Sequence, residues 1–162
     1  CFGGYFRDGY TRYGHSIYRL VYHAVLVTKY RKPIISTEIM AFIKNYTKSL
    51  IEERYGGKLL DLYGCADYIH ILFELPPTVI PTDIINIVKT QISKQARIKY
   101  SEQLSRQLQD DPFWSNSYFL STSGTNDQKV IERYIEEQGT PRPKRKYTLS
   151  KPRTRRKKED LS

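Results

Sequence analysis

The stretch "GCADYIHILFELPP", residues 64–77, is typical of a β-strand whose two faces differ in polarity. Side chains alternate between the faces of a strand, so residues two apart share a face. One face is apolar and predicts a stripe in the core, made of Ile69, Ile71, Phe73 and Leu75. The other face is half polar and carries Tyr68, His70, Leu72 and Glu74. A lone histidine on a strand face is most often structural, so His70 alone leaves a structural role and metal binding both open.

Three further segments have the composition of strands. β-branched and aromatic residues at 17–30 predict a strand that ends before Pro33. Residues 58–64 predict a second strand directly before the opening stretch, and a short strand is expected around 117–122.

Three segments have the spacing of apolar residues that an amphipathic helix needs. Each begins at a residue that can cap a helix N-terminus. Their expected extents are 36–54 (capped by Ser36 or Thr37), 82–108 (Thr82 or Asp83) and 126–138 (Asn126 or Asp127). The resulting order, β-α-β-β-α-β-α, predicts an α+β fold with an antiparallel sheet and helices on one face.

The net charge of +10 is concentrated at the C-terminal end of the chain. Residues 1–140 hold 17 Lys and Arg against 15 Asp and Glu, whereas residues 141–162 hold 10 against 2. Residues 141–162 are therefore expected to be a basic, flexible tail that binds a polyanion such as nucleic acid, or that only solubilises the protein. Residues 1–16 predict an irregular Gly/Tyr/Arg arm that either stacks on unpaired bases or packs on the body. The folded domain is expected to span 17–140.

Length and composition exclude several classes of protein. A chain of 162 residues suits one domain with a core of its own. It contains no apolar run of the roughly 20 residues that a membrane span needs, so no membrane partner is expected. Its two cysteines form no disulfide framework, which favours a reduced, cytoplasmic protein, and binding to nucleic acid would associate it with the nucleoid. The sequence has no phosphate-binding P-loop, no GxGxxG motif after a strand and no CxxC pair.

Basic residues at two places are candidates for DNA binding. One group closes the strand at 17–30 and the other lies on the helix at 82–108. Together they are Lys29, Arg31, Lys32, Lys89, Lys94 and Arg97. Such a charged surface can follow a phosphate backbone, and simple solvation of a helix face is the equally plausible alternative.

The last expected helix carries a second set of candidate residues. Tyr134 and Gln138 are four residues apart and therefore lie on one face, one turn apart. Tyr134 can be an aromatic edge of the apolar side of the helix. A tyrosine hydroxyl can also attack a phosphodiester and form a covalent phosphotyrosine, with a divalent cation polarising the phosphate. His70 and the amide oxygen of Gln138 are donors of the type such a cation accepts.

The chain resembles the single-tyrosine HUH transposases of the IS-200/IS-605 insertion-sequence group, whose HUH motif is His, a bulky apolar residue, His. Four stretches carry the likeness in the order of the family, over roughly residues 16–140. They are "YHAVLVTKYRKP" (22–33), "DYIHILFELPP" (67–77), "FWSNSYFLSTSG" (113–124) and "VIERYIEEQ" (130–138).

The resemblance implies a ferredoxin-like α+β sandwich with a separate C-terminal tyrosine helix. It also implies a homodimer with composite active sites, which binds single-stranded DNA hairpins at the ends of a mobile element. The function it implies is a DNA transposase that cleaves and rejoins one strand through a 5′-phosphotyrosine. Tyr134 would be the nucleophile, and His70 and Gln138 would be ligands of Mg²⁺ or Mn²⁺.

The sequence departs from the family motif at Tyr68, where the first histidine is expected. A neutral phenol is a poor ligand for a hard cation, and ionising it is costly because its ordinary pKa is near 10. Three interpretations follow. Tyr68 binds the metal as a phenolate or through water, Glu74 or Asp67 replaces it, or the site has lost cleavage and kept hairpin binding. The alternative function is thus a catalytically impaired or domesticated hairpin-binding protein.

Overall fold

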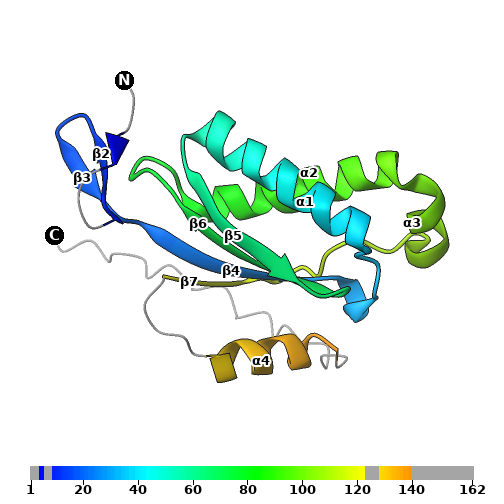
Figure 1. Cartoon of the computed structure of the whole chain (residues 1–162). Coiled ribbons are helices and arrows are strands. Elements are labelled where there is room, and N and C mark those ends of the chain that lie inside the picture. Colours follow the sequence, from blue (N-terminus) through cyan, green and yellow to red (C-terminus); the bar gives the residue numbers. More distant parts are fainter. Residues whose placement is uncertain (1–3, 6–8, 123–127, 140–162) are drawn as a thin grey trace, which may run out of the picture.

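The computed structural model describes residues 4–5, 9–122 and 128–139 (Figure 1). Its centre is a four-stranded antiparallel sheet with the spatial order β5-β6-β4-β7. The strands are β4 (Val21–Val27), β5 (Lys58–Gly64), β6 (Tyr68–Glu74) and β7 (Phe119–Thr122). This order and the intervening helices are those of a ferredoxin-like sandwich, so the predicted fold class is confirmed.

The helices cover the two faces of this sheet unequally. On one face lie α1 (Thr37–Ser49), its π-helical continuation η3 (Leu50–Arg54), and α2 (Pro81–Lys99), which is followed by α3 (Ser101–Leu108). The opposite face is covered by α4 (Gln128–Glu137) alone among the described elements (Figure 1). None of the described helices has the length and apolar character that crossing a bilayer requires.

Two apolar clusters follow from this arrangement. The larger joins the sheet to α1, α2 and α3, and the stripe predicted on β6 lies in it: Ile69, Ile71, Phe73 and Leu75 are all buried. The smaller consists of Val25, Val27, Ile131 and Ile135, and fastens α4 to β4. Because β4 contributes to both clusters, Ala24 to Val27 are buried without interruption, and the strand alternates only in part.

The predicted strand at 17–30 is wrong in extent because it is two strands. Ser16–Tyr18 form β3, which pairs with β2 (Thr11–Tyr13), and the chain then turns into β4 at Val21. After Val27 the backbone enters a short 3-10 helix, η2 (Lys29–Arg31), in which Tyr30 has a φ of 57°.

The N-terminal arm is also more regular than predicted. Within it, β1 (Gly4–Tyr5) pairs with β2, and β2 pairs with β3, to form a small antiparallel sheet at one end of the molecule (Figure 1). The described part of the arm thus forms hydrogen-bonded strands, although its sequence shows little apolar periodicity. The expected tail, residues 141–162, lies outside the described residues.

The predicted helix at 82–108 is interrupted at Tyr100, whose ψ of 36° is not helical. The break lets α3 turn so that Leu104 and Leu108 are buried in the larger cluster. The predicted cap is also wrong, because the helix begins at Pro81 with Ile80 before it. Proline suits the first helical position, where its fixed φ is helical and its missing N–H is not needed. By contrast, Ser36 caps α1 as predicted, accepting a hydrogen bond from the backbone N–H of Ile39.

Candidate active site

The candidate site lies on the sheet face that α4 covers. Alternation along β6 turns Tyr68 and His70 toward this face, opposite the buried stripe. In the register of the sheet, His70 lies between Val25 of β4 and Tyr63 of β5. His23 is two residues before Val25 on β4, so it shares this face and is a diagonal neighbour of His70.

Aromatic rings surround His70 on this face. Nδ1 of His70 is 2.9 Å from Nε2 of His23. The ring of Tyr63 lies parallel to the His70 ring, with centroids 4.7 Å apart and planes 9° apart. The ring of Tyr68 meets it edge-on, at 5.5 Å and 79°. The orientation of the His70 ring is therefore fixed by contacts from three side chains.

The environment of the histidine pair disfavours a positive charge. Burial lowers the pKa of His70 to about 4, and the neighbouring His23 contributes to the same direction. Burial likewise lowers the pKa of His23. Both rings are consequently neutral near pH 7, which is the state that can donate a nitrogen lone pair to a metal ion.

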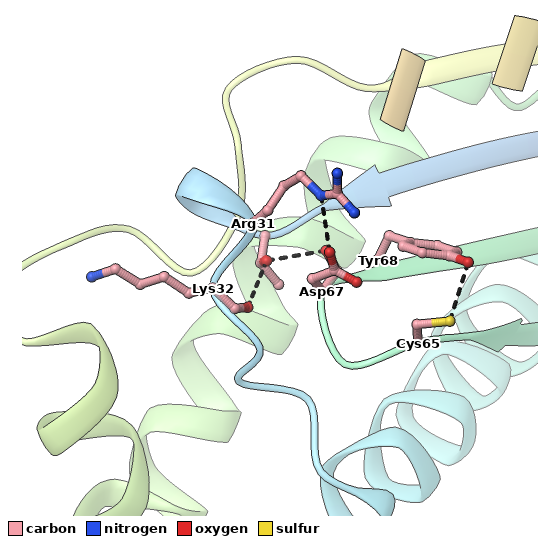
Figure 2. A network of polar contacts seen from close by, with 6 residues as sticks. Arg31, Lys32, Cys65, Asp67 and Tyr68 are labelled. Atoms are coloured by element: carbon pink, nitrogen blue, oxygen red, sulfur yellow. Dashed lines mark hydrogen bonds and ion pairs between the residues drawn. The ribbon is translucent and has the colours of Figure 1, made fainter. Parts of the chain in front are cut away.

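The surroundings of Tyr68 favour the neutral phenol over the ionised phenolate that would bind a metal ion. Its pKa is raised to about 12, first by the hydrogen bond with Cys65, then by burial and by the nearby charges of Cys65 and Asp67. Sγ of Cys65 lies 3.1 Å from the Tyr68 hydroxyl and donates to it (Figure 2). Without a metal ion, the phenolate form of Tyr68 is therefore unfavourable.

The two carboxylates that could replace a ligand at position 68 point elsewhere. Oδ2 of Asp67 accepts a hydrogen bond from Nε of Arg31 at 2.9 Å, and Figure 2 shows this contact. Glu74 lies at the far end of β6, is buried, and accepts a hydrogen bond from the Thr11 hydroxyl at 2.7 Å. Neither carboxylate is directed at His70.

Tyr134 and Gln138 form a polar network with the loop that precedes β7. The Tyr134 hydroxyl donates to Oγ of Ser117 at 3.1 Å. The hydroxyls of Ser117 and Ser115 donate to Oε1 of Gln138, at 3.1 Å and 2.9 Å. The amide nitrogen of Gln138 is buried, and no described residue pairs with it. The structure thus brings the two residues together, as their spacing predicted.

His70 and Tyr134 lie on opposite flanks of α4. Ile131 and Ile135 form the stripe of α4 that packs on β4. With 3.6 residues per turn, the side chain of Glu132 leaves one flank of this stripe and that of Tyr134 leaves the other. Accordingly, a pocket of about 400 Å³ beside His70 is lined by Glu132, Ile131 and Ile135, together with His23, Tyr63 and Tyr68. Tyr134 and Gln138 face the Ser115–Ser117 side instead.

The residues present fit a divalent metal ion only in part. His70 offers a neutral imidazole and Gln138 an amide oxygen, both suitable donors. Tyr68 fits less well, because its hydroxyl accepts a hydrogen bond from Cys65 and its pKa is raised to about 12. Within the part of the chain that the structure describes, no three His, Cys, Asp or Glu side chains come together as a metal site. One subunit, in this arrangement, does not assemble the ligand set that the resemblance implies.

Four of the six basic residues predicted to bind DNA make ion pairs or hydrogen bonds with other groups of the fold. Arg31 pairs with Asp67 and Lys32 with Asp111, the latter at 2.7 Å. Lys89 donates to the backbone oxygen of Ser115 at 2.8 Å, and burial lowers its pKa. Arg97 donates to the backbone oxygen of Asp111.

Two of the predicted basic residues are placed differently. Lys29 lies over the ring of Tyr30, 5.1 Å from its centroid, and Lys94 is exposed. DNA binding stays a prediction for all six residues. The structure adds that Lys89 and Arg97 hold the loop that contacts Tyr134 and Gln138.

Reasoning from the sequence missed His23 and the serines of that loop. The signal for His23 was present, because alternation along β4 places it with Val25 and Val27 on the face opposite Ala24 and Leu26. The sequence does not show that the two histidines are neighbours, because 47 residues separate His23 from His70 and only the sheet brings β4 and β6 together. Ser115 and Ser117 lie in a loop without periodicity and carry no comparable signal.

Comparison with known proteins places this geometry in context. A family model described as "Transposase IS200 like" matches residues 16–138. The chain is 27% identical over 124 residues to the transposase of insertion sequence element IS200 of Salmonella typhimurium, covering 76% of this chain and 80% of that protein. It is 25% identical over 122 residues to the ISDra2 transposase TnpA of Deinococcus radiodurans, covering 75% and 86%.

One solved structure is similar in fold over most of its length. It is a crystal structure of a protein from Deinococcus radiodurans assigned as a transposase, and the TM-score is 0.71. The match covers 80% of this chain and 98% of that one at 24% identity, so it bears on the fold alone.

Proposed function

We propose, from the premise that this chain belongs to the family of IS200-like transposases, that it cleaves and rejoins single-stranded DNA through Tyr134. The observation that supports this most is the placement of α4. Its Tyr134 and Gln138 share one polar network, and the helix covers the same sheet face that presents His70. Nucleophile and candidate ligands therefore lie on the same side of the sheet, with Tyr134 and His70 on opposite flanks of α4.

The proposed reaction is an exchange of phosphodiester bonds that needs no external energy. Oη of Tyr134 attacks the phosphorus, the bond from phosphorus to the 3′ oxygen breaks, and the products are a 5′-phosphotyrosine and a free 3′ hydroxyl. The proton lost by Tyr134 is balanced by the proton taken up by the leaving 3′ oxygen. Attack by another 3′ hydroxyl on the phosphotyrosine restores Tyr134 and rejoins the strand.

A divalent ion, Mg²⁺ or Mn²⁺, would polarise the phosphate and stabilise the leaving oxygen. His70 and Gln138 are the proposed protein donors. In this arrangement the amide oxygen of Gln138 accepts hydrogen bonds from the Ser115 and Ser117 hydroxyls, and a bound ion would have to replace them. Tyr63 and Tyr68 hold the His70 ring from its face and its edge.

We further propose that the active protein is a homodimer with composite sites. Tyr134 and Gln138 leave the flank of α4 opposite to the His70 pocket, so one chain in this arrangement keeps nucleophile and imidazole apart. A helix α4 supplied by a second subunit would solve this problem without refolding either sheet. The amide nitrogen of Gln138 is buried and pairs with no described residue, and a second position for the helix would give it a partner.

The proposed substrate is a single-stranded DNA hairpin at the end of a mobile element. The exposed Lys94 and the ring of Tyr30, which is 66% exposed, are suited to a phosphate and an unpaired base. The 10 basic residues between 141 and 162 would add affinity that falls with salt.

A second function, hairpin binding without cleavage, is favoured by one observation. The phenol of Tyr68 stands where the family motif has a ligand, and its raised pKa keeps it neutral. Such a protein would bind the same DNA, and Tyr134 would serve only in packing.

One experiment separates the two functions. Single-stranded imperfect hairpins are selected from a pool by binding to the protein, and then incubated with it and Mg²⁺ or Mn²⁺. The transposase proposal expects a covalent adduct on a denaturing gel, lost in Tyr134→Phe while hairpin affinity is kept. Absence of an adduct with either ion, on a hairpin that the protein binds, would overturn cleavage and leave the binding function.

A further inference from the structure

The contact between His23 and His70 joins two strands on the candidate catalytic face. Nε2 of His23 and Nδ1 of His70 are 2.9 Å apart, a distance typical of a hydrogen bond between ring nitrogens. Both side chains are half-buried, and the strand register places them diagonally across β4 and β6. The family likeness assigns no role to His23.

The ring geometry shows that the two nitrogens face each other directly. The ring centroids are 5.2 Å apart and the planes differ by 22°. With the nitrogens at 2.9 Å, this centroid separation is close to the largest possible, because each nitrogen lies within one bond length of its own ring centre. Two imidazoles that bound the same ion would turn toward a third point, and their centroids would be closer. The two histidines are therefore joined by a hydrogen bond and are not arranged to bind one metal ion together.

A neutral imidazole carries one N–H, so this hydrogen bond can exist in two forms. If Nδ1–H of His70 donates, Nε2 of His70 keeps a lone pair. If Nε2–H of His23 donates, the proton of His70 must sit on its own Nε2, which then cannot bind a metal. Nε2 of His70 has no partner among the described residues, and the ring lines the pocket of about 400 Å³ beneath α4.

We propose that His23 is a positioning residue, which accepts the Nδ1–H of His70 and so fixes the tautomer that presents a bare Nε2 to the pocket. The proposal rests on the proposed function in that Nε2 is the donor offered to Mg²⁺ or Mn²⁺. A hydrogen-bond acceptor behind a ligating histidine sets its tautomer and raises its basicity. The effect matters more here than in a site with two histidines, because Tyr68 leaves His70 as the single imidazole donor on β6.

The tautomer is tested on the metal-free full chain by long-range ¹H–¹⁵N NMR at pH 7.5. The protein has 3 histidines, so each imidazole gives a distinct signal that the three single variants assign. We expect the Nδ1–H form of His70 in the wild type and a shift toward the Nε2–H form in His23→Ala. The exposed His15→Ala is the matched control and should leave the His70 signal unchanged. A wild-type His70 protonated on Nε2 would overturn the proposal without the need for any variant.

Metal affinity supplies the second readout, with Mn²⁺ as the probe followed by electron paramagnetic resonance. His23→Ala should weaken binding about 10–100-fold. His23→Gln should recover part of this loss, because its amide oxygen can accept the same hydrogen bond. Equal affinity of His23→Ala and His15→Ala overturns the proposal, provided that thermal unfolding shows both to be folded. If the wild type binds no Mn²⁺ but shows the His23-dependent tautomer, the positioning role stands and the metal in the proposed function fails.

Discussion

At the scale of a single residue, His70 makes the stability of the folded protein depend on pH. Unfolded, His70 has its ordinary pKa of 6.5; folded, its pKa is about 4. Between these values the unfolded chain binds more protons than the folded one. The free energy of unfolding therefore falls as the pH drops from about 6.5 to 4, and the contribution of His70 to stability is fully present above pH 6.5. The full shift corresponds to ~3 kcal/mol. Because the ring is only half-buried, we expect on the order of 1 kcal/mol.

Urea unfolding at pH 7 and pH 4.5 measures this term. His70→Gln should flatten the difference between the two pH values, whereas His15→Gln, at an exposed position, should keep the wild-type difference. An unchanged pH dependence in His70→Gln would show that the ring protonates as readily in the folded protein as in the unfolded chain.

Tyr68 is the residue at which the chain departs from the family motif, and its hydroxyl is expected to be dispensable for metal binding. Its pKa of about 12 keeps the phenol neutral, and the hydroxyl is directed to Cys65. Tyr68→Phe keeps the ring that contacts His70, so Mn²⁺ affinity should stay within about twofold. Tyr68→His adds an imidazole and should tighten binding by about tenfold. Tyr63→Phe, on the neighbouring strand, is the control. A tenfold loss in Tyr68→Phe alone would identify the phenol as a ligand.

Individual site residues differed in how far the sequence could predict them. Tyr134 and Gln138 were predictable as a pair, because four-residue spacing on a helix fixes their common face whatever the tertiary structure. His23 was not, because its role depends on which strand lies beside β4. The basic residues were the least predictable. A cation in the sequence does not reveal whether a carboxylate or a carbonyl, such as those of Asp67 and Ser115, will be folded against it.

At the scale of elements, the β5–β6 hairpin carries most of the side chains around His70, and Gly64 makes its tight end possible. A Cβ at Gly64 would lie 2.1 Å from the backbone oxygen of Tyr68 and 2.7 Å from Cα of Ile69. Only a shift of β6 would relieve this, so Gly64→Ala should cost about 2–4 kcal/mol. In thermal unfolding this corresponds to a fall in Tm of roughly 10 °C.

The neighbouring Cys65→Ala is the matched control for Gly64→Ala. Cys65 is exposed, and its backbone N–H keeps its hydrogen bond to the Tyr68 oxygen whatever its side chain. We expect a change under about 0.5 kcal/mol. Equal Tm values for the two variants would mean that the hairpin end can open without loss.

The elements themselves were largely predictable where local signals agree with packing. The apolar stripe of β6 and the Ser36 cap of α1 are set by alternation and by a short hydrogen bond, and both are confirmed. No Gly or Pro in the sequence indicates the break at Tyr100. It exists because Leu104 and Leu108 reach the core only if the chain bends there, a tertiary effect that overrides helix propensity.

At the scale of the whole molecule, the position of α4 decides whether one chain can be an enzyme. The helix is fastened to β4 by Ile131 and Ile135, each 8% exposed, with Tyr134 on one flank and the His70 pocket on the other. A composite dimer predicts complementation between two inactive variants, Tyr134→Phe and His70→Ala, when they are co-expressed. Half of the dimers are then mixed, and each mixed dimer has one intact site, so about a quarter of the wild-type adduct should return. The adduct should form only on the His70→Ala polypeptide, which keeps Tyr134, and a size tag on one variant identifies it. Mixed dimers that form no adduct would place both residues of a site in the same chain, and α4 would then have to turn on its own sheet to bring Tyr134 to His70.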